Sequence, residues 1–479
     1  MNAATVDPAT AKPVTVDVVI PYYRDQRMLD RILAALRHQT GLAAPPRVIV
    51  ADDGSPTPPA VPAGVTVVRQ DDRGFRASAA RHLGAGTGDG EVLLFLDGDT
   101  VPGPDYVAAL LAALDGNPDL LVVGRRRYGR FAEPVEDRPR GDIDLDSDVH
   151  ADIDADTHVA EVLPDPDWPA AFYAETDGLT RGEGQSGAGL WRGVLSAVFG
   201  LHRRLYDVAG GFDPDIVGYG GEDWDLAWRC EQVGGRFRYV PEAVAWHDGP
   251  DWGGRAGAGG ESDDPEHLAQ KNAETARLAP LIANPLTRPA GGIFALPLVA
   301  VHIHAANGGA GFAVAGTGAV AATCASLLHW ADVAVTVDPA TAGRATADPA
   351  TSDAAVIAEL FAADPRVRLD PRGPWWEPGR AGAGPRRRPE VLVDIHRPCT
   401  LGALGLQRLR ELCPSVGSVT LVDEGRVLAQ VRSSRALARE QVWGVSPGAT
   451  AGIPASEVGV RPLGADGAGV RLERVLGGW

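Results

Sequence analysis

The chain of 479 residues is too long for one ordinary domain, so two to three domains are expected. Its 44% hydrophobic and 23% charged residues are typical of a globular protein and exclude a mainly disordered chain. The formal net charge of −18 argues against nucleic acid or an anionic membrane surface as the main partner.

The first predicted elements alternate between strand and helix. Residues 14–20 form a β-branched run typical of a buried strand, and apolar residues at helical spacing follow at 28–36. The alternation continues with strands at 48–51, 65–68 and 92–96 and a helix at 78–84. It predicts an α/β fold with a doubly wound, mainly parallel sheet, whose ligands bind at the carboxyl ends of the strands.

Acidic residues follow two of these strands. Asp52 and Asp53 come after the second strand, and Asp97-Gly98-Asp99 comes after the fourth. Two carboxylates at i and i+2 can engage a hard cation and a ribose from one tight turn, and the glycine between them allows close backbone approach. The sequence therefore predicts a nucleotide site at this edge of the sheet.

A second acidic group, Gly220-Gly221-Glu222-Asp223, precedes a predicted helix at 224–231. Taken alone, it indicates only a helix start at which acidic residues are favourable. His247 follows a strand-like segment and can supply a nitrogen ligand, although a lone histidine is more often structural.

The later part of the chain predicts a second domain. A helix is expected at 265–282, a Pro/Gly-rich linker at 284–292 and a new strand at 298–303, which gives domains of 1–290 and 295–479. The acidic stretch 133–167 is expected to be a solvated insertion. The longest uncharged run, 297–330, is expected to be buried strand and helix rather than a membrane span.

Localisation is expected to be cytoplasmic. The N-terminus has no apolar signal core, and the four cysteines form neither metal-ligand pairs nor a dense disulfide framework.

The second domain echoes the first. Residues 391–412 follow the same order of strand, acidic turn and helix as residues 92–114, with Asp394-Ile395-His396 in place of the acidic pair. This pattern predicts a degenerate copy of the first fold whose sheet is parallel with Val391–Val393 at its centre. An unrelated α/β domain remains the alternative.

Several segments occur in an order that resembles the family 2 glycosyltransferases, in particular the bacterial branch with a galactosyltransferase-like C-terminal motif. They lie within residues 14–250 and are VDVVIPYYRD, VIVADDGSP, RGFRASAARHLG, VLLFLDGDTVPGPDYV, VAGGFDPDIVGYGGEDWDLAWR and VAWHDGP. The resemblance implies a GT-A-type fold. It also implies metal-dependent, inverting transfer of a sugar from a nucleoside-diphosphate sugar, a UDP-sugar, to a hydroxyl of a glycan or other acceptor, with Mn²⁺ or Mg²⁺ as cofactor.

The resemblance also implies roles for individual residues. The donor-binding residues would be Pro21, Tyr23, Asp52, Asp53, Arg76, Arg81 and Asp97. The metal ligands would be Asp99, Asp97 and His247. Asp223 matches the catalytic base, Glu222 its acceptor-binding neighbour, and Trp224 can stack on a sugar of the acceptor. One base and one cation suffice for direct displacement, and hence for inversion at the anomeric carbon.

Two other classes of function remain open. The first is a sugar nucleotidyltransferase, a class whose members resemble one another in a Gly-rich N-terminal loop. The first strand of this chain runs instead into Pro21-Tyr22-Tyr23-Arg24, without such a loop. A non-catalytic nucleotide-sugar or glycan-binding protein would keep the pocket without the reaction. Release of free nucleoside diphosphate when acceptor is added separates these possibilities.

Overall fold

The computed structural model describes residues 13–131, 159–165, 189–250, 265–289, 291–303, 318–339, 352–371, 387–445, 451–463 and 470–472. The chain forms two compact units. Unit 1 is Met1–Glu231 with Gly235–Thr275, and unit 2 is Gln232–Gly234 with Ala276–Trp479. Most of the predicted acidic insertion lies outside the described residues. Among the described helices, none combines the length and the apolar character needed to cross a bilayer.

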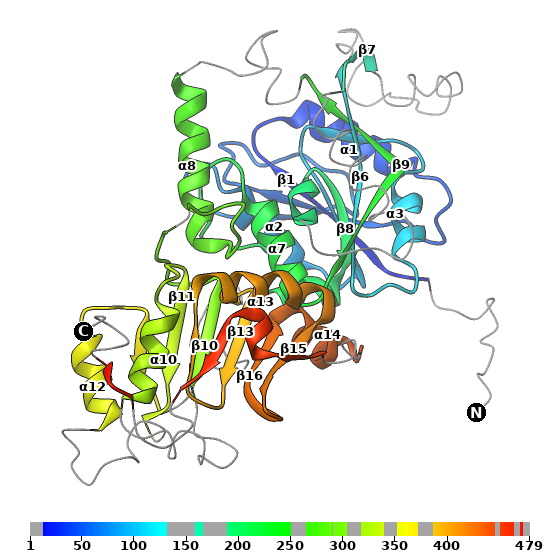
Figure 1. Cartoon of the computed structure of the whole chain (residues 1–479). Helices are drawn as coiled ribbons and strands as arrows, with labels where there is room; N and C mark the ends of the chain where they lie inside the picture. Colours follow the sequence, from blue (N-terminus) through cyan, green and yellow to red (C-terminus); the bar gives the residue numbers. More distant parts are fainter. Residues whose placement is uncertain are drawn as a thin grey trace, which may run out of the picture. The chain divides into compact units, whose positions relative to one another are not determined.

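Unit 1 is built on a nine-stranded sheet with the order β3-β2-β1-β4-β8-β6-β9-β5, and β7 pairs with β6 (Figure 1). The strands are β1 Val16–Tyr22, β2 Arg47–Asp52, β3 Thr66–Arg69, β4 Val92–Leu96, β5 Thr100–Pro102, β6 Leu120–Phe131, β7 Val159–Leu163, β8 Val198–His202 and β9 Arg236–Asp248. The helices are α1 Gln26–Arg37, α2 Ala77–Thr87, α3 Tyr106–Leu114, α6 Arg203–Ala209, α7 Glu222–Gln232 and α8 Pro265–Leu281, which continues into unit 2.

The first four strands of this sheet are parallel, as the alternation of strand and helix predicts. β3, β2, β1 and β4 pair in parallel, whereas β8 runs antiparallel to both β4 and β6. All five residues of β4 are buried, because a central parallel strand is covered on both faces and needs aliphatic residues throughout. Phe95 stacks on Phe199 of β8 at 4.8 Å between ring centroids. The predicted α/β fold is confirmed.

The register of these strands brings the predicted site residues to one edge. Tyr22 pairs with Asp52, and Val19 pairs with Phe95, so β1, β2 and β4 end almost level. The turns after the strands, with Asp53 and Asp97, therefore begin at the same edge of the sheet.

Unit 2 has a seven-stranded sheet with the order β12-β11-β10-β13-β16-β15-β17, and a separate pair of β14 and β18. The strands are β10 Val299–Ile303, β11 Val333–Val337, β12 Val367–Leu369, β13 Val391–Ile395, β14 Cys399–Leu401, β15 Ser418–Asp423, β16 Arg426–Ser433, β17 Ala451–Pro454 and β18 Val460–Pro462. The helices are α10 Ala319–Leu327, α12 Asp353–Leu360, α13 Ala403–Val416 and α14 Ser434–Trp443.

The sheet of unit 2 repeats the topology of unit 1. In each unit the first four main strands lie parallel in the order third, second, first, fourth, and an antiparallel strand follows (β8 or β16). The next strand (β6 or β15) is antiparallel to that one and parallel to the strand beyond it (β9 or β17). The predicted α/β sheet with β13 at its centre is confirmed, although antiparallel β16 interrupts the parallel run after β13. That unit 2 is a degenerate copy of unit 1 stays a prediction.

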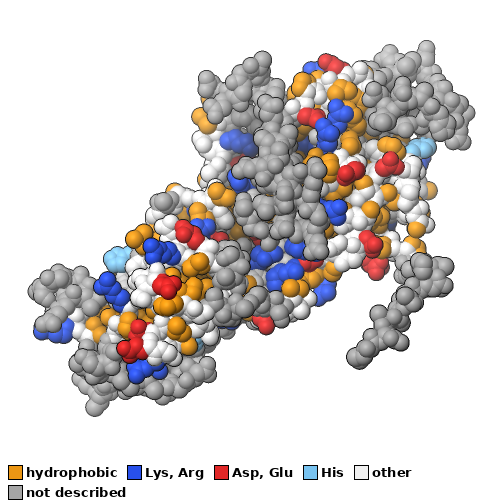
Figure 2. Space-filling view, turned by 45° about the vertical axis from the view of Figure 1, so that its right-hand side comes forward, with side chains coloured by type: hydrophobic (Ala, Val, Ile, Leu, Met, Phe, Trp, Pro, Cys, Tyr) orange, Lys and Arg blue, Asp and Glu red, His pale blue; other side chains and the backbone are white. Residues whose placement is uncertain are grey.

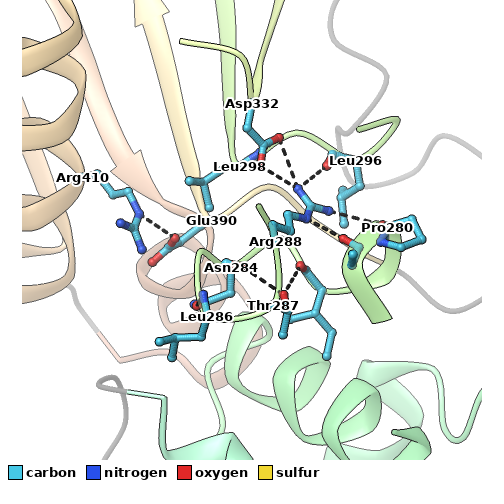
Figure 3. Close-up of polar contacts among 12 residues, drawn as sticks. Pro280, Asn284, Leu286, Thr287, Arg288, Leu296, Leu298, Asp332, Glu390 and Arg410 are labelled. Atoms are coloured by element: carbon cyan, nitrogen blue, oxygen red, sulfur yellow. Dashed lines mark hydrogen bonds and ion pairs between the residues drawn. The ribbon is translucent and has the colours of Figure 1, made fainter. Parts of the chain in front are cut away.

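The predicted linker at 284–292 is fastened to unit 2 by Arg288. The side chain of Arg288 is 2% exposed, and it donates to the carbonyl oxygens of Ala279 and Leu296 and lies 2.9 Å from Asp332 (Figure 3). Burial lowers the pKa of Arg288, and Asp332 opposes that shift. The Pro/Gly-rich segment is therefore a bonded turn rather than free chain, because its one buried cation binds carbonyl groups on both sides of it.

The surface of the described residues carries both signs of charge. Figure 2 shows acidic, basic and hydrophobic side chains interspersed on the face that it presents. All four cysteines are buried and unpaired, as their spacing predicts.

Candidate active site

Arg81 joins the two acidic motifs of unit 1. It lies on α2, is 3% exposed, and its Nη1 donates to Glu222 Oε1 at 2.9 Å while its Nη2 donates to Asp97 Oδ1. Burial opposes the charged form, but the two carboxylates outweigh it and raise the pKa of Arg81. The guanidinium therefore stays charged and holds residues 125 positions apart in one site.

Asp99 and His247 form the second contact of the site. β5 pairs with β9 so that Thr100 lies opposite His247, and His247 Nε2 lies 3.3 Å from Asp99 Oδ2. His247 Nδ1 lies 3.2 Å from the carbonyl oxygen of Gly249, which can only accept a hydrogen bond. A neutral imidazole that donates from Nδ1 to this carbonyl would have its Nε2 lone pair available to a cation shared with Asp99, the arrangement expected of a metal ligand.

Glu222 and Asp223 begin α7 after a turn that depends on glycine. Gly220 and Gly221 have φ values of +83° and +91°, a region that other residues rarely adopt. Asp223 Oδ1 accepts from its neighbour Trp224 N at 2.8 Å. The turn thus aims both carboxylates into unit 1 rather than along the surface.

The pKa of the Asp223 carboxyl group is raised toward neutral pH. Its Oδ2 accepts from Ser196 N at 3.2 Å, a contact that the sequence did not predict. Burial, and then the charge of Glu222, raises the pKa of Asp223 to about 7, against the lowering effects of the Ser196 and Trp224 amides and of Arg81. A carboxylate with such a pKa is suited to accept a proton near neutral pH.

Trp224 lies beside a second tryptophan. Its ring meets that of Trp191 edge-on, with 5.6 Å between centroids, and Trp191 is fully buried while Trp224 is half-buried. Trp224 is therefore held by packing on one side and presents apolar ring surface next to Asp223.

The predicted nucleoside residues divide into buried and exposed ones. Asp52 is fully buried and accepts from Ser55 N at 2.8 Å. Asp53 accepts from the backbone N–H of Arg76 at 2.8 Å and from the side chain of Gln70, so it fixes the start of α2. Tyr23 is 44% exposed.

Gly98 brings the ends of β1 and β4 together. A Cβ atom at this position would lie 2.7 Å from the carbonyl oxygen of Pro21. Any larger residue would push the Pro21 turn away from Asp97, which explains why the motif has glycine in the middle.

Residues 17–155 match the sequence model of the family described as Glycosyl transferase family 2. The match lies within unit 1 and supports a family 2 glycosyltransferase. The chain is also 31% identical to validoxylamine A glucosyltransferase of Streptomyces hygroscopicus subsp. limoneus, over 49% of this chain and 51% of the relative. It is 24% identical to chondroitin synthase of Pasteurella multocida, over 50% of this chain and 25% of the relative. The chain thus spans about half or less of the length of these curated relatives.

Solved structures of low similarity include two glycosyltransferases. One is GalNAc-T7 with UDP, GalNAc and Mn²⁺, at 18% identity and a TM-score of 0.35 over 49% of this chain and 44% of that chain. The other is the mannosyltransferase PcManGT of Pyrobaculum calidifontis with GDP-Man and Mn²⁺, at 18% identity and a TM-score of 0.34 over 56% and 65%.

Unit 1 brings together two of its three predicted metal ligands. Asp99 and His247 are adjacent, whereas Asp97 is bound to Arg81. Within the described ranges, no three His, Cys, Asp or Glu residues form a metal cluster. Two protein ligands nevertheless fit Mg²⁺ or Mn²⁺ in a nucleotide site, because these ions take further ligands from substrate phosphates.

Unit 2 repeats the strand order of unit 1 but lacks an acidic pair after its fourth strand. β13 ends at Ile395 and β14 begins at Cys399, just as β4 and β5 flank residues 97–99, so His396-Arg397-Pro398 replaces Asp97-Gly98-Asp99. The prediction that Asp394-Ile395-His396 takes this place is wrong by two residues, because the strand runs further than expected. Asp394 lies within β13 and is 2.6 Å from Arg432.

Proposed function

We propose that this protein transfers a sugar from a nucleoside-diphosphate sugar, a UDP-sugar, to a hydroxyl of a glycan or other acceptor, with inversion at the anomeric carbon. Catalysis is assigned to residues 1–290, and residues 295–479 form a non-catalytic copy. The four buried thiols fit a reducing cytoplasm. The 31% identical relative is named a glucosyltransferase, which makes a glucosyl donor the first to test.

The observation that carries this proposal is the Arg81 bridge. It fixes Asp97, at the donor edge of the sheet, against Glu222, whose neighbour Asp223 has the pKa of a general base. Both halves of a transfer reaction, the leaving diphosphate and the attacking hydroxyl, thereby have partners in one site.

In the proposed mechanism, Asp223 accepts the proton of the acceptor hydroxyl as the oxygen attacks the anomeric carbon. The hydroxyl has a far higher pKa than Asp223, so proton transfer is concerted with attack. Glu222 orients the acceptor through hydrogen bonds, and Trp224 stacks on its sugar ring. One displacement inverts the anomeric carbon, and the diphosphate leaves with the electron pair of the broken bond.

Asp99 and His247 would hold Mn²⁺ or Mg²⁺, with Asp97 ordering the same edge through Arg81. When bound, the cation supplies positive charge to the diphosphate. Asp52, together with the Pro21–Tyr23 turn, would contact the nucleoside. Asp53 would act by placing Arg76 and the start of α2 beside the diphosphate.

The test is a thermal-shift screen of nucleotide sugars with Mn²⁺ or Mg²⁺, starting with UDP-glucose. A donor that binds only the folded state raises Tm. At a free donor concentration of 100 times Kd, it adds about 2.7 kcal/mol to the free energy of unfolding. Addition of sugar acceptors to the donor that binds should release free nucleoside diphosphate. Binding without any release, across a broad acceptor panel, would favour the non-catalytic binding protein instead.

The pH profile is expected to report Asp223. Only the ionised carboxylate accepts a proton, so kcat/KM should fall about tenfold per pH unit below pH 7 and level off above it. Glu222→Gln removes the neighbouring negative charge, so its remaining activity should show the inflection at lower pH. A wild-type profile that is flat between pH 5 and 8 would contradict the assignment.

A further inference from the structure

Three consecutive arginines, Arg125, Arg126 and Arg127, lie on β6 next to the site and were not used by the sequence-based assignment. Side chains alternate along a strand, so the first and third share one face. These two meet the same carboxylate, because Arg125 lies 2.8 Å and Arg127 3.8 Å from Asp165. The middle arginine lies on the other face, with Tyr128.

Pairing between strands places that other face beside the predicted metal ligands. β9 lies between β5 and β6, with Thr100 opposite His247 and His247 opposite Tyr128. The rings of Tyr128 and His247 are 5.4 Å apart. Arg126 is two residues from Tyr128 on the same face, so it stands diagonally to His247, within reach of a long side chain.

The position of Arg126 is fixed by Tyr128. Its Nε donates to Tyr128 Oη at 2.8 Å, and its guanidinium lies over the Tyr128 ring at 5.1 Å. His247, which stands diagonally to Arg126, lies 3.3 Å from Asp99, so the guanidinium is on the same face of the sheet as the predicted metal ligands.

Charge compensation gives this arrangement a role. The diphosphate gains negative charge as the bond to the sugar breaks, and positive groups placed in advance stabilise it. The family resemblance implied this task for Arg76 and Arg81, yet Arg81 is buried between Asp97 and Glu222. We propose that Arg126, held by Tyr128, is a further donor-binding residue that contacts the diphosphate of the nucleotide sugar. This inference rests on the proposed transferase function.

The experiment measures the affinity of the full chain for UDP, GDP, ADP, CDP and dTDP by calorimetry with Mn²⁺, and compares the tightest with its monophosphate. Arg126→Gln should weaken binding of the diphosphate by about 10- to 100-fold, since a hydrogen bond to a charged group is lost. The monophosphate should lose less. Arg126→Lys, which keeps the charge, should lie between Arg126→Gln and the wild type.

Two variants separate ligand contact from a purely structural role. Arg125→Gln, on the opposite face of the same strand, should bind as the wild type does. Tyr128→Phe keeps the ring against His247 but removes the tether, so it should weaken diphosphate binding less than Arg126→Gln, with an unchanged Tm.

Two outcomes overturn the inference in different ways. If Arg126→Gln binds the diphosphate as tightly as the wild type, Arg126 is not a donor-binding residue, and the proposed function stands. If the wild type binds none of the five diphosphates with Mn²⁺ or Mg²⁺, the proposed function itself fails and this inference fails with it.

Discussion

Asp223→Asn is expected to lower kcat by about 10²–10⁴-fold, because the amide cannot take the proton of the acceptor hydroxyl. Donor affinity should change little, since the residue acts on the acceptor side. Single-turnover rates with saturating donor and acceptor measure the effect directly. Wild-type turnover in this variant would reduce Asp223 to a residue that merely begins α7.

The design needs a check on folding. Both carboxylate oxygens of Asp223 accept hydrogen bonds from backbone N–H groups. The NH₂ group of an asparagine cannot accept, so one of these two backbone N–H groups would lose its partner. The longer contact, to Ser196, is expected to open, so Tm must be measured alongside turnover. Asp215→Asn, at an exposed position in the loop before α7, is the matched control and should retain full activity.

Asp99→Ala is expected to remove metal-dependent donor binding and to lower kcat/KM by about 100-fold or more, because the cation loses one of two protein ligands. His247→Gln should act in the same direction. Excess chelator should abolish activity of the wild type, and Mn²⁺ or Mg²⁺ should restore it.

Asp115→Ala, after the far end of α3, removes an exposed aspartate without touching the site and serves as the control. Full wild-type activity in excess chelator would refute metal dependence and would leave Asp99 and His247 as a structural pair.

The parallel strands were predictable because burial on both faces leaves a continuous aliphatic run, as in β1 and β4. The antiparallel strands β6 and β8 were not predicted. Their residues follow no simple alternation, since both strands lie in the middle of the sheet. In unit 2, the acidic Asp394 inside β13 shifted the expected end of the strand by two residues.

The acidic motifs of the site could be found in the sequence, but their partners could not. Arg81 was expected at the diphosphate, and its contacts with Asp97 and Glu222 span 16 and 141 residues. Local patterns do not encode such pairings, because the three residues come from α2, the turn after β4 and the start of α7, which meet only in the folded unit. For the same reason, no sequence motif predicted the hydrogen bond from the Ser196 backbone N–H to Asp223.

The repeated topology has a consequence for stability engineering. In unit 2, the same strand order forms with His396-Arg397-Pro398 at the edge where unit 1 places Asp97 and Asp99. The fold therefore does not require carboxylates at that edge, and unit 1 keeps them for activity. Stability and function oppose each other in the same way in other proteins. Burial and the charge of Glu222 disfavour the ionised form of Asp223, a cost that the fold bears for activity. Glu222 is paired with buried Arg81, so neutralising Glu222 should lower the melting temperature.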